Sequence, residues 1–250
     1  MRFVRTLAAT AAALLMAGVV DAQNDAPLSV LQTSVACAPP PSFTGPPAGA
    51  PRIIGAQDTV PRRLFGEHDL LVIDAGTASG LQLGQQFFVR RENRFGTPSG
   101  QHSRGVRTLG WLRVVALNDT TAIAAVQHIC GGIIQYDYLE PFTVPVVPAG
   151  AERDDAPGEP DFTTLAHFVA ANEDRQTAGA GDFMLIDRGT EQGMAPGTRV
   201  AVYRDTRSPH MPLASVGEAV VVSVGPTSAL TRITRARDAV LSGDYVAIRR

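Results

Sequence analysis

The chain contains one sequence pattern twice, and this repeat constrains the fold more than any other feature. Residues 71–91 read LVIDAGTASGLQLGQQFFVRR, and residues 184–204 read MLIDRGTEQGMAPGTRVAVYR. Corresponding positions are 113 residues apart here and 107 apart further along, where Gly110 corresponds to Gly217. The difference indicates a deletion in the second copy, opposite the polar segment 92–108, which is predicted to be an exposed hairpin tip. The chain is therefore predicted to carry a duplicated domain.

Both copies are predicted to consist of β-strands. Runs such as LLVIDA and RVAVYRD are rich in apolar and β-branched residues, and turn signals separate them. About five or six short strands of this kind are typical of a small barrel or sandwich. The predicted fold class is all-β, with two tandem small β-barrel-like domains. The predicted segments are a signal peptide at 1–22, a proline-rich segment at 23–50, the first repeat at 51–142, a linker at 143–165 and the second repeat at 166–250.

Three glycines in each copy have the spacing of packed transmembrane helices, which is one interpretation of the repeat. They are Gly76, Gly80 and Gly84 in the first copy and Gly189, Gly193 and Gly197 in the second. A helix is disfavoured because Pro196 interrupts the second copy and each glycine costs a helix about 1 kcal/mol. We therefore predict structural glycines. The first of each trio ends a strand in a positive-φ turn, and the others let a loop fold across the barrel end.

Two further pairs of residues recur at this turn. Leu81 and Met194, between the glycines, are predicted to point inward as apolar plugs. Asp74 and Asp187 resemble a catalytic pair of carboxylates. Their shared position at a strand end before glycine favours a side chain that caps the turn instead.

The N-terminus has the pattern of a secretory signal peptide. Arg2 and Arg5 precede an uncharged run over residues 6–20, and a small-residue cleavage site precedes Gln23. The alternative is an uncleaved membrane anchor, but the run is shorter than the roughly 18 residues of a spanning helix. We expect a mature chain without a membrane span, located in the periplasm or secreted.

The chain has two cysteines, Cys37 and Cys130. In an oxidising compartment an even count favours one disulfide, and the alternative is two buried thiols. We predict a disulfide that fastens the N-terminal segment to the end of the first repeat.

Composition excludes several classes of function. The 22 basic residues are all arginine, so catalytic lysines and the lysine of a phosphate-binding loop are absent. A net charge of −2 gives no electrostatic footprint for nucleic acid, and no such partner is expected.

The standard catalytic and metal-binding motifs are missing from the sequence. There is no HExxH, and GTASG places its serine wrongly for a nucleophile elbow. His128 lies two residues before Cys130, where a His/Cys metal site is conceivable, but two ligands are too few for a closed zinc site. We therefore predict no enzyme activity, no cofactor and no metal, and structural or surface roles for the histidines.

Two features are candidates for a binding surface. Trp111, the only tryptophan, either fills the core of the first copy or marks a binding surface, and partial burial is favoured. Arg232, Arg235 and Arg237 recur along TRITRAR, which places cations on one sheet face where they can meet anionic envelope polymers. The alternative is a solvated face with local ion pairs.

Two segments are rich in proline. ACAPPPSFTGPPAGAP, from Ala36, is predicted to be an unpacked polyproline-like tether, or alternatively a ligand for a proline-recognition partner. TVPVVPAGAERDDAPGEPDFT, between the copies, is predicted to be an extended, semi-flexible linker that lets the two units reorient.

The repeat also resembles a known family. It contains Ile-Asp-x-Gly-Thr-x-x-Gly, a strand ending in arginine, and a closing Gly-Asp-Tyr or Tyr-Asp-Tyr. This pattern resembles the C-terminal domain of the flagellar assembly protein T family, and it is similar to β modules of other bacterial envelope proteins, including the rod-shape-determining protein C family. The resemblance covers about residues 69–140 and 182–248, and it implies a β fold and an envelope location. It implies no catalytic residues, because those domains are assembly or scaffold parts.

Together, these observations predict an exported, non-catalytic binding or scaffold protein of the bacterial cell envelope. Its expected partner is an envelope protein or a cell-wall polymer. The alternatives are a secreted glycan- or peptidoglycan-binding protein and, third, a divergent secreted hydrolase.

Overall fold

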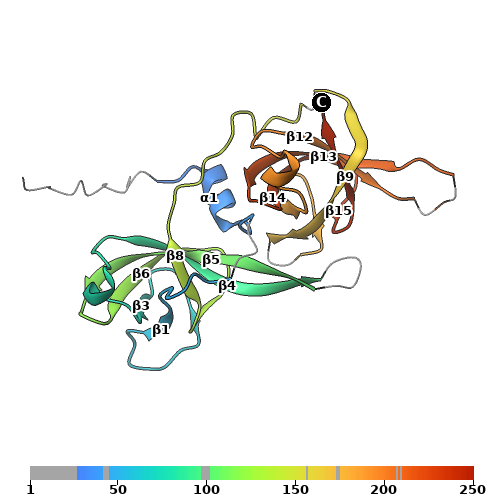
Figure 1. Ribbon diagram of the computed structural model, residues 1–250. Helices are drawn as coiled ribbons and strands as arrows, with labels where there is room; N and C mark the ends of the chain where they lie inside the picture. The colour runs from blue at the N-terminus through green and yellow to red at the C-terminus, as the bar shows by residue number, and fades with distance from the viewer. Residues whose placement is uncertain are drawn as a thin grey trace, which may run out of the picture.

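The computed structural model describes residues 27–41, 45–96, 102–155, 157–172, 175–206, 208 and 210–250. The predicted signal peptide and the tip of the hairpin predicted at 92–108 lie outside these residues. The rest of that predicted tip forms the strand ends of the hairpin. Two β units, joined by a short helix, account for most of the described chain (Figure 1).

The first unit is a six-stranded antiparallel sheet that curves back on itself. Its strands are β1 (Ile53–Ala56), β3 (Leu70–Ile73), β4 (Gln86–Gly96), β5 (His102–Leu117), β6 (Ala122–Ile129) and β8 (Tyr138–Pro141). They are ordered β1-β3-β6-β5-β4-β8. The two edges meet, because an isolated bridge pairs Arg52 with Tyr138 and the Leu139 amide donates to the Pro51 carbonyl at 2.8 Å.

The second unit is a closed barrel with the same order of strands. Its strands are β9 (Pro160–Ala171), β11 (Phe183–Ile186), β12 (Arg199–Arg204), β13 (Ala214–Val224), β14 (Ala229–Ala236) and β16 (Tyr245–Arg249), and the order is β9-β11-β14-β13-β12-β16. Each unit adds a two-stranded sheet: β2 (Leu64–Phe65) with β7 (Ile133–Ile134), and β10 (Thr177–Ala178) with β15 (Val240–Leu241). The predicted duplication and the all-β fold class are confirmed.

Apolar side chains fill the interior of each unit. Alternation along the strands places every second residue inside, as in β6, where Ala122, Ala124 and Val126 are buried. Leu81 belongs to the core of the first unit and Met194 to the separate core of the second, which confirms the prediction that both point inward. Side chains therefore fill the interiors of both units.

The first glycine of each trio is required for a different reason from the one predicted. Gly76 and Gly189 have extended backbones, with φ of −144° and −129°, so the predicted positive φ is wrong. A Cβ at Gly76 would overlap the carbonyl oxygen of Asn118, in the turn between β5 and β6. A Cβ at Gly189 would overlap the carbonyl oxygen of Gly225, in the matching turn of the second unit. The glycine is needed because two backbone segments touch here.

This contact fixes a short 3-10 helix against the hairpin turn in both units. In the first unit, η1 (Thr77–Ser79) donates from the Thr77 amide to the Asn118 carbonyl at 3.0 Å. In the second, η3 (Thr190–Gln192) donates from Thr190 to Gly225 at 2.9 Å. The remaining glycines lie in left-handed backbone: φ is 80° at Gly80, 81° at Gly84, 80° at Gly193 and 88° at Gly197.

The repeated aspartates bind a neighbouring strand rather than their own turn. The Asp74 carboxylate accepts from the Arg52 amide at 2.6 Å, and the Asp187 carboxylate accepts from the His167 amide at 2.7 Å. The predicted turn cap is thus replaced by a side-chain link to the strand that opens each unit. The physical reason is that a carboxylate at the end of a strand reaches the backbone amide of the neighbouring segment and gives it a hydrogen-bond acceptor.

A bidentate arginine–aspartate pair closes each unit at the same place. The Arg91 guanidinium donates to both oxygens of Asp137, at 2.7 and 2.8 Å, and Arg204 donates to Asp244 at 2.7 and 2.7 Å. The hydrogen bonds that Arg204 donates to the Asp244 carboxylate raise the pKa of Arg204. Both aspartates are almost fully buried, and each also accepts from a backbone amide three residues earlier. This fork ties the residue just before the last strand, β8 or β16, to the strand that carries the arginine, β4 or β12.

Two predictions about the connecting segments are wrong. The stretch from Ala36, predicted to be an unpacked tether, begins at the end of a packed helix, α1 (Val30–Cys37), and its residues Ala36 and Ala38 are buried against the two units. The segment predicted as a reorienting linker is packed on the second barrel, where Arg199 donates to the Gly150 and Arg153 carbonyls. Its last residues already belong to β9, so the second barrel begins at Pro160.

Substituting Gly76 or Gly189 by alanine is expected to lower the free energy of unfolding by about 1–3 kcal/mol, because the added methyl forces the hairpin turn away. Denaturant-induced unfolding measures the loss. The matched control is Gly55→Ala in β1, where a Cβ meets nothing within 4 Å and little change is expected. Equal stability of all three variants would contradict the close-approach explanation.

Substituting Asp137 or Asp244 by asparagine is expected to destabilise the chain by about 1.5–3 kcal/mol, because each fork loses its charge-assisted hydrogen bonds. Asp238→Asn is the control: this exposed carboxylate also pairs with Arg204, at 3.1 Å, but is screened by solvent. Thermal unfolding should rank the control close to the unmodified protein. A control as damaging as Asp244→Asn would show that burial of the fork is not decisive.

Candidate functional site

Helix α1 begins and ends for local reasons. Ser29 accepts from the Gln32 amide at 3.1 Å, and the Gln32 side chain accepts from the Ser29 amide at 2.9 Å, which is a complete capping box. The helix ends at Cys37, because Ala38 precedes Pro39 and a residue before proline is disfavoured in helical backbone. The chain therefore carries a short, sharply bounded helix.

The helix contacts both barrels, between which it lies in Figure 1. Val35 and Ala38 pack on the outer surface of the second barrel, against residues of β11, β13 and β14. Those residues are Phe183, Leu185, Val222 and Leu230. Ala36 instead packs on the first barrel with Phe88 and Trp111. The contacts on both sides make α1 the connection between the units.

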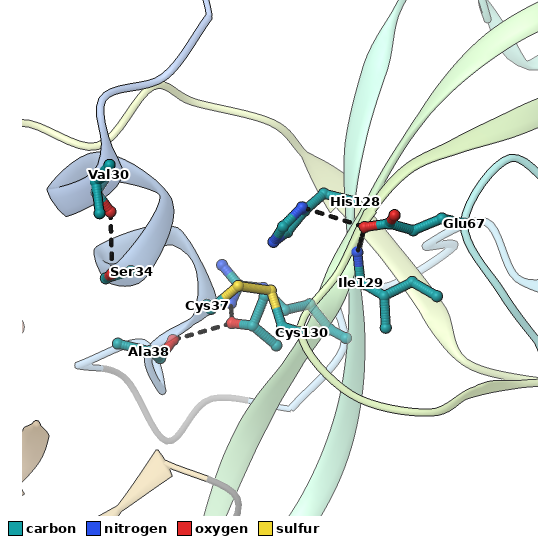
Figure 2. Close-up of a disulfide and its surroundings, with 10 residues drawn as sticks. Val30, Ser34, Cys37, Ala38, Glu67, His128, Ile129 and Cys130 are labelled. Atoms are coloured by element: carbon teal, nitrogen blue, oxygen red, sulfur yellow. Dashed lines mark hydrogen bonds and ion pairs between the residues drawn. A yellow bond between two sulfur atoms is a disulfide. The ribbon is translucent and has the colours of Figure 1, made fainter.

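A disulfide joins α1 to the first barrel. Cys37, the last residue of the helix, is bonded to Cys130, directly after β6, with their Cα atoms 5.3 Å apart (Figure 2). The predicted pairing is confirmed, and it fastens the N-terminal segment to the end of the first repeat.

Trp111 lies under this helix rather than on an open surface. Its side chain is only 9% exposed, and its ring stacks on His128 with centroids 4.5 Å apart. His128 Nδ1 lies 3.4 Å from a carboxylate oxygen of Glu67, which also accepts from the Ile129 amide at 3.4 Å. The structure thus places an indole, an imidazole and a carboxylate side by side near the disulfide.

A buried arginine supports the chain where it leaves α1. Arg90 in β4 donates to the Thr108 hydroxyl, and Thr108 donates to the Ala38 carbonyl at 3.0 Å. Burial lowers the pKa of Arg90, and the Glu140 carboxylate 3.3 Å away opposes this effect. Burial, followed by the charge of Glu140, raises the pKa of Tyr138 well above its ordinary value. This cluster holds a charge on the sheet face that carries the N-terminal segment.

The three arginines predicted as a cationic strip have separate roles. Arg232 donates to the Ala151 carbonyl at 3.1 Å, so the segment between the units covers it. Arg235 pairs with the nearly buried Glu218 at 2.6 Å. Arg237 follows β14 and is exposed.

The repeat register relates these arginines to the surroundings of the disulfide. Trp111 is paired with His128 across β5 and β6, and the corresponding positions of the second unit, Glu218 and Arg235, are paired across β13 and β14. The position of Cys130 corresponds to Arg237. Apolar and thiol groups therefore stand where α1 covers the first barrel, and ion pairs stand at the same place on the second.

On the other side of the helix, the face of the second barrel is covered and the corresponding face of the first barrel is open. The residues of the second barrel that α1 covers correspond to Leu70, Val72, Val115 and Ile123 of the first barrel. These four define what we call the open apolar face. Leu70 is 41% exposed and Val115 is 43% exposed, whereas their counterparts Phe183 and Val222 are buried. Analysis of the sequence missed this face, although the register of the repeat contains the signal.

His167 lies beside Asp187, the second of the two repeated aspartates. Its ring lies 3.1 Å from Asp187, in a half-exposed pair. The other oxygen of that carboxylate holds the backbone amide of His167 itself. Asp187 thus has a structural task, as its counterpart Asp74 does.

Comparisons with protein-family models and with curated proteins find no match to this chain. Of the helices that the structure describes, none combines the length and apolar character needed to cross a membrane.

Replacing both cysteines by serine is expected to lower the free energy of unfolding by about 2–4 kcal/mol, because the bond closes a loop between residues 93 positions apart. Denaturant-induced unfolding measures this loss. Emission of Trp111 should shift to longer wavelength if α1 separates from the indole. Reduction of the unmodified protein is the control and should move the midpoint by the same amount. An unchanged midpoint in both cases would contradict a stabilising role.

Proposed function

We propose that this chain is an exported, non-catalytic binding or scaffold protein of the bacterial cell envelope, periplasmic or secreted. Its two barrels have apolar, filled interiors, and their outer faces carry the contacts with other parts of the chain. Such an architecture supports binding on surfaces rather than in an enclosed pocket.

The open apolar face is the observation that carries this proposal. On the second barrel the same face binds an apolar helix, through Val35 and Ala38. On the first barrel it is left with Leu70 and Val115 partly exposed to solvent. An apolar face that a helix covers on one barrel is suited to contact a partner where it is open on the other. We propose that a helix of an envelope protein binds there as α1 binds to the second barrel.

The export part of the proposal is supported by the disulfide and by the N-terminal sequence. A disulfide between residues far apart is typical of proteins in oxidising compartments. The first residues have the pattern of a signal peptide. The resemblance to flagellar assembly and rod-shape proteins agrees with an envelope location.

The glycan-binding alternative has less support. It depends on an exposed strip of aromatic and arginine side chains, but Trp111 lies under α1 and Arg232 lies under the segment between the units. It is therefore kept as an outcome of the test.

The test is photo-crosslinking in the native cell, because the chain has no lysine for amine-reactive reagents. A photoreactive residue at position 115 is expected to give a discrete protein adduct, whereas the same residue at Leu83, which is 68% exposed outside this face, gives none. Leu70→Glu should abolish the adduct at position 115 while leaving the circular dichroism spectrum unchanged.

Three results would count against the proposal. Adducts with sugar polymers would favour the glycan binder. Equal adducts from positions 83 and 115 would show no preference for the open apolar face. An adduct that survives Leu70→Glu would place the contact elsewhere.

A further inference from the structure

The two cysteines of the disulfide and the neighbouring His128 together have the composition of a metal site. The sulfur atoms of Cys37 and Cys130 and a ring nitrogen of His128 all lie within 4.8 Å of one another. Figure 2 shows these side chains meeting where the end of α1 reaches the first barrel. The sequence suggested the two cysteines as a pair and His128 as a neighbour of Cys130, and the structure brings all three together.

The fold holds these groups in place from three directions. His128 lies near the end of β6 and Cys130 directly follows the strand, so both are held at this end of the first barrel. Cys37 is fixed by the end of the helix. The stacked Trp111 ring limits rotation of the imidazole. Such preorganisation favours binding of an ion over random contact of three side chains.

We propose that the reduced form of this site binds Zn²⁺ through the thiolates of Cys37 and Cys130 and the imidazole of His128. Thiolate and imidazole are the preferred zinc ligands, at about 2.3 and 2.0–2.1 Å from the metal. Ligand atoms around a tetrahedral ion are then roughly 3.3–3.8 Å apart, within reach of the observed grouping. Water supplies the fourth ligand.

The oxidised and metal-bound forms exclude each other, because both use the same two sulfur atoms. A dithiol reductant breaks the S–S bond by giving it two electrons and two protons, and becomes a cyclic disulfide itself. Zn²⁺ then binds the two sulfurs as thiolates and releases the two protons to solvent. The neutral imidazole of His128 supplies its lone pair as the third protein ligand.

Glu67 acts as a positioning residue for the imidazole. Its carboxylate lies 3.4 Å from His128 Nδ1, which favours the tautomer with the proton on Nδ1 and a free lone pair on Nε2. Zinc-binding histidines commonly pass their second N–H to a carboxylate in this way.

The consequence is that α1 stays fastened to the first barrel in either state. The disulfide fastens it in the oxidised form, and the metal would do so in the reduced form. Glu218, Arg235 and Arg237 occupy the corresponding positions of the second barrel, so the described residues there do not repeat this group. The inference is independent of the proposed partner on the open apolar face.

The test is titration of the full chain with Co²⁺ and then Zn²⁺, without oxygen and with a phosphine reductant, because a dithiol would itself bind zinc. Co²⁺ is expected to give a thiolate charge-transfer band at one ion per chain and to quench the fluorescence of Trp111, the only tryptophan. Zn²⁺ should remove both signals. The oxidised chain should show neither signal.

Variants separate the named site from binding by loose thiols. His128→Ala is expected to weaken Co²⁺ binding by about 100-fold, because one of three protein ligands is lost, and Glu67→Gln by about 10- to 100-fold. His167→Ala is the control: this histidine also lies beside a carboxylate but has no cysteine in its group. It should bind Co²⁺ like the unmodified protein.

The inference is overturned if the reduced chain shows no charge-transfer band, if the oxidised chain binds equally well, or if His128→Ala is without effect. A His128→Ala variant without effect is also the expected result if the chain unfolds on reduction, because two free cysteines would then bind Co²⁺ without the histidine. None of these outcomes bears on the crosslinking test at position 115.

Discussion

The contact of helix α1 with both barrels is the constraint on which the arrangement of the chain depends. The second barrel is closed by its own strands, and the edges of the first sheet meet at an isolated bridge. Each unit is filled by its own side chains, so neither needs the other to complete its core. A separate element must therefore join them. A helix of eight residues is too short to be stable alone, and burial on both sides together with one covalent bond keeps it in place.

The two copies diverge on their outer surfaces and agree inside. Inward positions are apolar in both, because a barrel interior must be filled at close-packed density. Outward positions follow what lies above them. Where α1 covers the first barrel the chain has Trp111 and Cys130, and at the same place on the second it has Glu218 and Arg237. The same duplication explains why an apolar face can be covered in one copy and open in the other.

Much of the architecture was predictable from local signals, but the contacts that make particular residues necessary were less predictable. The repeat and its strand pattern predicted two β units, and the position of Leu81 between glycines predicted its burial. Gly76 was recognised as structural, yet its reason is contact with a turn some forty residues later, which no local pattern reveals. Helix α1 was missed because prolines follow it closely, although the spacing of Ser29 and Gln32 is the signature of a capping box.

The sequence by itself determined that the chain folds as two like β units and that its two cysteines pair, because strand alternation, turn residues and a count of thiols are local or compositional properties. Only the tertiary structure decided which outer faces are covered, that Trp111 lies beneath a helix, and that His128 stands beside the Cys37–Cys130 bond. The physical reason is that outward side chains acquire their neighbours from segments far away in the chain. Their environment is set by how finished units pack, not by the pattern that forms each unit.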